Sequence, residues 1–219
     1  MKQNFWTWWA FKPTESELKK YVNELYMDVN WMWGAVDHIS ETKDYVKLCK
    51  DLGVKLYFRV PCFASAFYQE SGLSKEDVKK DIKQWIRDFR KLGVHIALDY
   101  IRNNPLCGIY KPTREDIREI VDYAYSKDKD TIVALFPKYI SWYYNQYYSD
   151  FKKLRIMPMI YGTNFWTYIS LIWHKWMGYE PCIKGWNIEL DEFKFQASLL
   201  EPKKYSIWRW NHWKENIKE

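Results

Sequence analysis

The chain has 219 residues, 47% of them hydrophobic and 28% charged, and its formal net charge is +6 at pH 7. This composition excludes a disordered chain, and the length suits one domain, 1–219, with a single core. Lys and Arg are spread without a block of like charge and no apolar run approaches about 18 residues, so we expect neither a nucleic-acid partner nor a membrane span.

Strand-like and helical patterns alternate along the chain. The predicted strands are 4–11, 29–36, 54–63, 94–101, 131–138, 155–162, 181–188 and 205–213. The predicted helices between them are 14–26, 40–53, 74–93, 113–128, 140–154, 165–179 and 191–202. Thr14 and Glu17 have the spacing of a capping box, and Gly53 and Gly93 follow helical patterns, where helices commonly end.

This alternation predicts parallel strands joined by right-handed crossovers, because only a crossover returns the chain in the same direction. Eight such units favour an α/β fold of the (β/α)8 class, a compact TIM barrel. The short tail after 205–213 leaves no room for a full eighth helix, so that helix is expected to be absent. An open sheet of about six strands is the alternative if the weak strand at 181–188 is not real.

In such a barrel the active site lies at the C-terminal ends of the strands. The residues expected there are Trp8, Trp9, Asp37, His38, Arg59, Asp99, Tyr100, Arg102, Lys138, Tyr161, Asn187, Glu189, Arg209, Asn211 and His212. Asp99 is the leading candidate for a catalytic carboxylate, because an acid at the end of a buried strand points into the barrel mouth. The alternative is a structural salt bridge between Asp99 and Arg59 or Arg102, without chemistry.

The segment GVHIALDYIRNNP (93–105) resembles the fourth-strand motif of a group of glycoside hydrolase-type TIM barrels. Gly93 and the run Asp-Tyr-Ile-Arg at 99–102 match that motif, whereas two asparagines replace the aromatic residue before Pro105. RIMPMIYG (155–162) is similar to the sixth strand of the group. DEFKFQASLLEPKKYSIWRW (191–210) is similar to its last helix and its Trp-Arg-Trp last strand.

The resemblance implies a glycosidase, retaining or inverting, that uses two carboxylates flanking the scissile bond. Asp99 would then be the nucleophile or base. Glu189, after the seventh predicted strand, is the first candidate for its partner, and Asp37 is the second. We interpret Asp191 as the N-cap of the next helix.

Aromatic residues make up 20% of the chain, with 14 Trp and 18 Tyr, which exceeds the needs of a core of this size. Flat rings suit a sugar site, since the C–H face of a pyranose stacks on them while its hydroxyls need polar partners. We expect Trp9 and Trp210 to be platforms. The expected polar contacts to substrate are Arg59, Tyr100, Arg102, Tyr161 and Arg209.

Other chemistries find less support in the sequence. The eight glycines form no phosphate-binding loop, and nucleotide and flavin motifs are absent. Cys49, Cys62, Cys107 and Cys182 lie far apart and the histidines are single, so we expect reduced thiols, no metal and no cofactor. The N-terminus lacks a secretory signal, which predicts a cytoplasmic protein, or a secreted one whose signal has been removed.

The sequence therefore predicts a glycoside hydrolase-like enzyme that acts on carbohydrate. Two alternatives stay open: a carbohydrate-binding barrel without catalysis, and an aromatic-rich binder of single-stranded nucleic acid. Exposed aromatic residues in ISWYYNQYYSDF (140–151) also predict a homo-oligomer.

Overall fold

The computed structural model describes residues 2–28, 39–63, 73–102, 111–184, 188–201 and 204–208. Its eight strands follow one another in chain order around a closed barrel, and β1 and β8 pair in parallel to close it. The predicted (β/α)8 barrel is confirmed, and the open six-stranded sheet is wrong. The tail from 209 onward lies outside the described residues.

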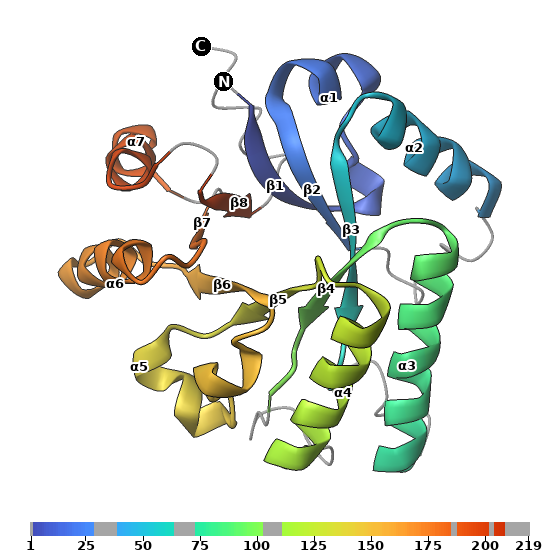
Figure 1. Ribbon diagram of the computed structural model, residues 1–219. Helices are drawn as coiled ribbons and strands as arrows, with labels where there is room; N and C mark the ends of the chain where they lie inside the picture. The colour runs from blue at the N-terminus through green and yellow to red at the C-terminus, as the bar shows by residue number, and fades with distance from the viewer. Residues whose placement is uncertain are drawn as a thin grey trace. The chain divides into compact units, whose positions relative to one another are not determined.

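Strands and helices alternate as expected (Figure 1). The strands are β1 (Gln3–Trp8), β2 (Val22–Asp28), β3 (Lys55–Pro61), β4 (His95–Asp99), β5 (Ile132–Leu135), β6 (Arg155–Ile160), β7 (Cys182–Lys184) and β8 (Ser206–Trp208). The helices are α1 (Glu15–Tyr21), α2 (Ile39–Asp51), α3 (Lys75–Lys91), α4 (Arg114–Lys127), α5 (Lys138–Ser141), α6 (Phe165–Trp176) and α7 (Leu190–Ser198). Short 3-10 turns are η1 (Trp9–Phe11), η6 (Trp142–Tyr144) and η7 (Tyr148–Phe151).

The chain divides into two compact units, and each is treated by itself below. Unit 1 comprises 1–57 and 157–219, and unit 2 comprises 58–156. A single domain over 1–219 stays a prediction. None of the helices among the described residues combines the length and the apolar character that crossing a bilayer requires.

Helix ends follow the capping signals of the sequence. The Thr14 hydroxyl accepts from the Glu17 N–H, and the Glu17 carboxylate accepts from the Thr14 N–H at 2.8 Å, which confirms the capping box. Gly53 and Gly93 have φ values of +68° and +81° after α2 and α3. Side chains with a Cβ disfavour this conformation, so glycine lets the chain turn directly into the next strand.

Aromatic side chains fill the inner face of the barrel within unit 1. The Trp6 ring lies 5.5 Å from the Tyr26 ring and 4.9 Å from the Trp208 ring, and Tyr26 lies 5.0 Å from Tyr57. Trp6 pairs in register with Tyr26 of β2 and with Trp208 of β8, so these rings form one layer. The adjoining layers pair Asn4 with Glu24 and Trp8 with Asp28.

Two expectations about the elements are wrong. The helix predicted at 14–26 ends at Tyr21, because the Val22 N–H makes the last helical bond and the chain then extends into β2. The strand places Glu24 and Tyr26 on one face, where the Tyr26 hydroxyl donates to the Glu24 carboxylate at 2.6 Å. Residues 29–36 lie outside the described part.

The long helix predicted at 140–154 is also wrong, because α5 ends at Ser141 and two 3-10 turns follow. Asn145 turns the chain with φ of +58°. The fully buried side chain of Gln146 then accepts a 2.8 Å hydrogen bond from the Phe136 N–H. A continuous helix would lack the turn at Asn145 that brings the Gln146 side chain to the end of β5.

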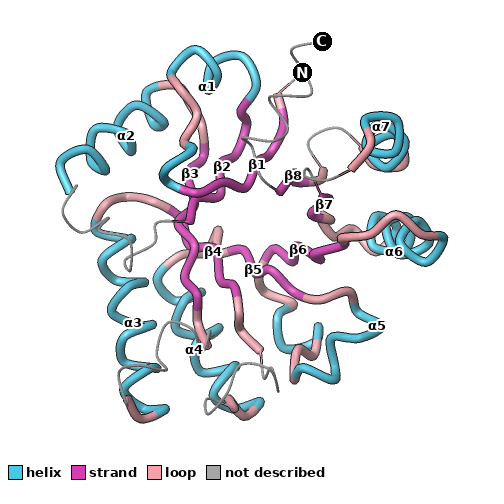
Figure 2. The backbone as a smooth tube through the Cα atoms, turned by 180° about the vertical axis from the view of Figure 1, so that it is seen from behind, coloured by secondary structure: helices cyan, strands magenta, loops and turns pink. Residues whose placement is uncertain are grey.

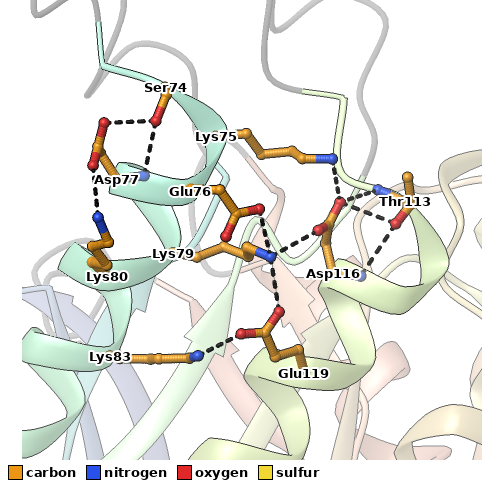
Figure 3. Close-up of polar contacts among 10 residues, drawn as sticks. All are labelled: Ser74, Lys75, Glu76, Asp77, Lys79, Lys80, Lys83, Thr113, Asp116 and Glu119. Atoms are coloured by element: carbon orange, nitrogen blue, oxygen red, sulfur yellow. Dashed lines mark hydrogen bonds and ion pairs between the residues drawn. The ribbon is translucent and has the colours of Figure 1, made fainter.

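In unit 2, a buried lysine joins the neighbouring helices α3 and α4 (Figures 1 and 2). The Lys79 ammonium lies 3.1 Å from Asp116, 2.8 Å from Glu119 and 2.9 Å from Glu76 (Figure 3). Burial alone would raise the pKa of Asp116. Hydrogen bonds from Lys75, the Thr113 N–H and Lys79 outweigh burial and hold that pKa well below its ordinary value.

We predict that Asp116→Asn lowers the free energy of unfolding by roughly 2 kcal/mol at pH 7, because Lys79 loses a buried carboxylate partner. Since the folded-state pKa of Asp116 is depressed, its contribution is present above the unfolded pKa of about 4 and is lost at lower pH. Urea denaturation should therefore show a smaller difference between wild type and variant at pH 3. Asp122→Asn, at an exposed pair with Lys153, is the control and should have little effect at either pH.

Candidate functional site

Asp99 ends β4 as the sequence predicts, and it is buried with an arginine beside it. Arg59 Nε lies 3.1 Å from Asp99 Oδ2, and the two side chains are 6% and 4% exposed. Asp99 Oδ1 accepts from the Tyr100 N–H at 2.7 Å. The guanidinium compensates the negative charge of a carboxylate that water scarcely reaches.

Tyr100 has a strained backbone immediately after this carboxylate. Its φ is +51°, a conformation that costs a bulky residue of order 1–3 kcal/mol and clusters at functional sites. The Tyr100 carbonyl accepts from the N–H groups of Phe63 and Arg102, which hold the turn. The Tyr100 ring lies 5.1 Å from the Arg59 guanidinium and 4.5 Å from that of Arg102. The structure thus brings together four predicted site residues at the end of β4: Arg59, Asp99, Tyr100 and Arg102.

Two residues that the sequence did not indicate, Cys62 and Phe136, also contact the residues at the end of β4. The Cys62 N–H donates to the Asp99 carbonyl at 2.8 Å, and the Phe136 ring lies 4.4 Å from the Arg102 guanidinium. Burial, and then the nearby charge of Asp99, raise the pKa of the Cys62 thiol. Cys62 is therefore a packed neutral thiol and not a nucleophile.

In unit 1, the ends of β1, β2 and β8 carry a second group of candidate residues. Trp8 is in register with Asp28, which is buried, and Trp208 ends β8. Tyr161, a predicted contact, is 38% exposed just after β6, and its ring lies 6.5 Å from the Trp208 ring. Among the described residues, Trp6 Nε1 is buried without a hydrogen-bond partner.

Two carboxylates of unit 1 approach one hydroxyl, but at the opposite end of the strands. The Tyr26 hydroxyl lies 2.6 Å from Glu24 and 3.2 Å from Glu180. Glu180 precedes β7 and also accepts from Asn4 and from Ser206, which begins β8. The N-terminal face of a TIM barrel serves stability, so we assign this cluster a structural role.

The remaining predicted residues are less well placed or not described. Trp9 lies in η1, where its ring packs edge-on against Tyr45 of α2 at 5.7 Å. Glu189 is exposed and is itself the N-cap position of α7, so Asp191 is in the first turn and the interpretation of Asp191 as the cap is wrong. Seven of the residues expected at strand ends or as platforms lie outside the described part: Asp37, His38, Asn187, Arg209, Trp210, Asn211 and His212.

Asp28 is the strand-end acid that the sequence reasoning missed. The run Leu-Tyr-Met-Asp at 25–28 stops on an acid as Ala-Leu-Asp does at 97–99. Leu18, Val22 and Leu25 also fit a helical spacing, and this hid the strand. A short apolar run that ends on Asp is the signal that could have identified it.

Within the described ranges there is no group of three or more His, Cys, Asp or Glu side chains placed to hold a metal ion. His174 is fully buried in α6, where Nδ1 lies 2.7 Å from the Ser170 carbonyl, and His95 contacts Asp128 at 3.1 Å. We assign both histidines a structural role, because each is held by a nearby carbonyl or carboxylate.

Comparison with known proteins identifies the fold. No protein-family model and no curated protein matches the chain. An endo-beta-1,4-mannanase from Thermotoga petrophila is similar in structure, with a TM-score of 0.61 and 11% identity over 94% of this chain and 67% of the mannanase. D-psicose 3-epimerase from Clostridium cellulolyticum H10 has a TM-score of 0.53 and 10% identity over 94% of this chain and 84% of its own.

A family 2 AP endonuclease from Brucella melitensis is also similar, with a TM-score of 0.54 and 11% identity, covering 96% of this chain and 93% of the endonuclease. At such identities the likeness shows the barrel fold alone. One fold carries many chemistries, so function must be argued from the strand ends.

We predict that Arg59→Met lowers the free energy of unfolding by about 3 kcal/mol, because it leaves the buried Asp99 carboxylate without its cation. Adding Asp99→Asn should recover part of this loss, since the amide needs no counter-charge. Urea denaturation of the two single variants and the double variant measures the coupling. If the losses simply add, the ion pair does not hold the β3 and β4 ends together.

Proposed function

We propose that the protein is a carbohydrate-active enzyme of the glycoside hydrolase type, with Asp99 as the nucleophile or base. The observation that carries this proposal is the end of β4, where a buried carboxylate is followed by a tyrosine at φ of +51° between two guanidinium groups. Strain of this kind is kept where the surrounding structure over-determines the backbone, often at functional sites.

The hydrogen bonds of Asp99 suit an accepting role. Oδ1 accepts from the Tyr100 N–H and Oδ2 forms an ion pair with the Arg59 guanidinium, and each oxygen keeps a further lone pair for substrate. Tyr100 and Arg102 would supply a ring and N–H donors to the same sugar. Arg102 Nε is buried without a hydrogen-bond partner among the described residues, which suits a group that awaits a ligand hydroxyl.

A glycosidase needs a second carboxylate as proton donor. Glu189 and Asp37 are the candidates from the sequence. The exposed position of Glu189 before α7 weakens its case. The aromatic residues of unit 1, including Trp208 and Tyr161, suit sugar stacking.

The names of two structural neighbours support a carbohydrate substrate, namely a mannanase and a sugar epimerase. The ion pair between Arg59 and Asp99 favours one alternative, a carbohydrate-binding barrel without catalysis. In that alternative the Asp99 carboxylate only holds the Arg59 guanidinium in place, and the sugar binds without being cleaved.

We predict that wild-type protein hydrolyses one or more of a panel of nitrophenyl glycosides and β-1,4-linked oligosaccharides, including mannans. Asp99→Asn should lower kcat by at least about a thousandfold, as loss of a covalent or general-base group does. Asp37→Asn and Glu189→Gln, assayed in parallel, identify the proton donor by the variant that recovers with substrates carrying a good leaving group.

Asp122→Asn, at an exposed position on α4, is the matched control and should retain full activity. Circular dichroism confirms that each variant folds. Wild-type protein that binds these oligosaccharides in calorimetry but cleaves none of them would support the binding barrel instead. If the protein neither binds nor cleaves any member of the panel, a carbohydrate function is refuted.

A further inference from the structure

Helix α6, in unit 1, exposes an apolar face that solvent does not favour. Phe165, Ile169, Ile172 and Trp176 are 66%, 44%, 49% and 81% exposed. Their spacing of four, three and four residues places them in one stripe along the helix. The buried residues Thr167, Ser170, Leu171 and His174 occupy the opposite side. Helix α6 is therefore apolar on its outer face as well, a pattern typical of a buried helix.

The apolar surface extends beyond the stripe. Trp166, at 71% exposure, packs against Phe165 with a ring distance of 5.7 Å. On the neighbouring helix α7, Phe195 is 48% exposed, and its ring lies 5.2 Å from that of Tyr168 (Figures 1 and 2). Stripe and flanks form one surface, which we call the α6 face: Phe165, Trp166, Ile169, Ile172, Trp176 and Phe195.

We propose that the α6 face binds the α6 face of a second copy of the chain, with the two α6 helices antiparallel about a two-fold axis. The stripe reads aromatic, Ile, Ile, aromatic, and its members lie symmetrically about the midpoint of the helix. In an antiparallel pair Phe165 therefore meets the second copy's Trp176, and Ile169 meets Ile172. Such self-complementarity is what a two-fold interface requires.

The area of the α6 face matches a dimer. The stripe spans 12 residues, about 16 Å from its first to its last Cα atom, and its exposed aromatic and Ile side chains offer on the order of 500 Å² per copy. Two copies then bury about 1,000 Å², the lower bound for a specific interface. Phe195 and Met177, both exposed, add to this area.

Charge also favours a second copy over an anionic membrane. Within α6, the only charged residue besides a buried histidine is Lys175, which donates to the Leu199 carbonyl at 3.1 Å. Helices that lie on membranes usually carry several Lys and Arg residues beside the apolar face. The α6 face lacks that basic border along the helix itself.

A charge-exchange experiment tests this pairing. One variant carries Ile169→Lys and Ile172→Lys, and the other carries Ile169→Glu and Ile172→Glu; both positions are about half exposed, so the fold should tolerate them. In sedimentation velocity the wild type should be a dimer. Each variant alone should be monomeric, with a dissociation constant raised by at least about a hundredfold because like charges meet. An equimolar mixture of the two variants should dimerise again.

Trp142→Glu is the matched comparison, because Trp142 is 61% exposed in η6, within the segment 140–151 whose exposed aromatic residues also predict self-association. If the α6 face is the interface, this variant should leave the dimer intact, and a dimer lost in this variant but not in the α6 variants would assign the interface to 140–151 instead. Wild-type protein that stays monomeric at high concentration, or charge variants that dimerise like wild type, would overturn the proposal. So would a mixture that fails to dimerise. Co-flotation of wild type, but not of the Glu variant, with phosphatidylcholine–phosphatidylserine vesicles would assign the α6 face to a membrane instead.

Discussion

Only every second side chain of a barrel strand reaches the interior, and this alternation governs both the packing and the strand ends of the protein. Along β1 and β2 the paired rows run from Asn4 and Glu24, through Trp6 and Tyr26, to Trp8 and Asp28. The layer of rings therefore has polar side chains on both sides, Asn4 and Glu24 toward the strand starts and Asp28 toward the strand ends. The same parity places Arg59 two residues after the inward Tyr57, where it meets Asp99.

Each end of these rows has a different consequence. At the strand starts, Glu180 accepts hydrogen bonds from Asn4 and Ser206 and lies 3.2 Å from the Tyr26 hydroxyl, and these contacts join β1, β2 and β8. Such a network stabilises the fold because its members satisfy one another. At the end of β4, by contrast, Asp99 is followed by a strained tyrosine and by a buried guanidinium nitrogen that has no partner among the described residues. Incomplete satisfaction of this kind is expected where a ligand binds.

Much of the fold could be predicted because helices and strands carry different periodicities. Capping residues such as Thr14 and Gly53 marked the boundaries, and the run up to Asp99 predicted a buried strand that ends on an acid. The prediction failed where one segment fits both periods. Val22 and Leu25 continue the helical pattern of α1. The hydrogen bond between Glu24 and Tyr26, two residues apart, forms because a strand places both side chains on the same face.

The site was predictable only where its members follow one another in the sequence or end a clear strand. Tyr100 and Arg102 follow closely after Asp99, and Arg59 lies near the end of the neighbouring apolar run. Outside the site, Gln146 gave no such signal either. Its hydrogen bond with the Phe136 N–H depends on the left-handed turn at Asn145. A conformation of one residue, favoured by tertiary contacts, is not encoded in any local pattern of apolar residues.

The surroundings of Asp99 also restrict the role that it could take in a reaction. Oδ1 accepts from the Tyr100 N–H and Oδ2 lies 3.1 Å from the permanently charged Arg59 guanidinium, an arrangement that suits a carboxylate acting as nucleophile better than a proton donor. A carboxyl group that donates a proton requires a less positive environment. The two carboxylates of a glycosidase work because their environments differ. If Asp99 takes part in such a pair, its partner must therefore be an acid without an arginine beside it.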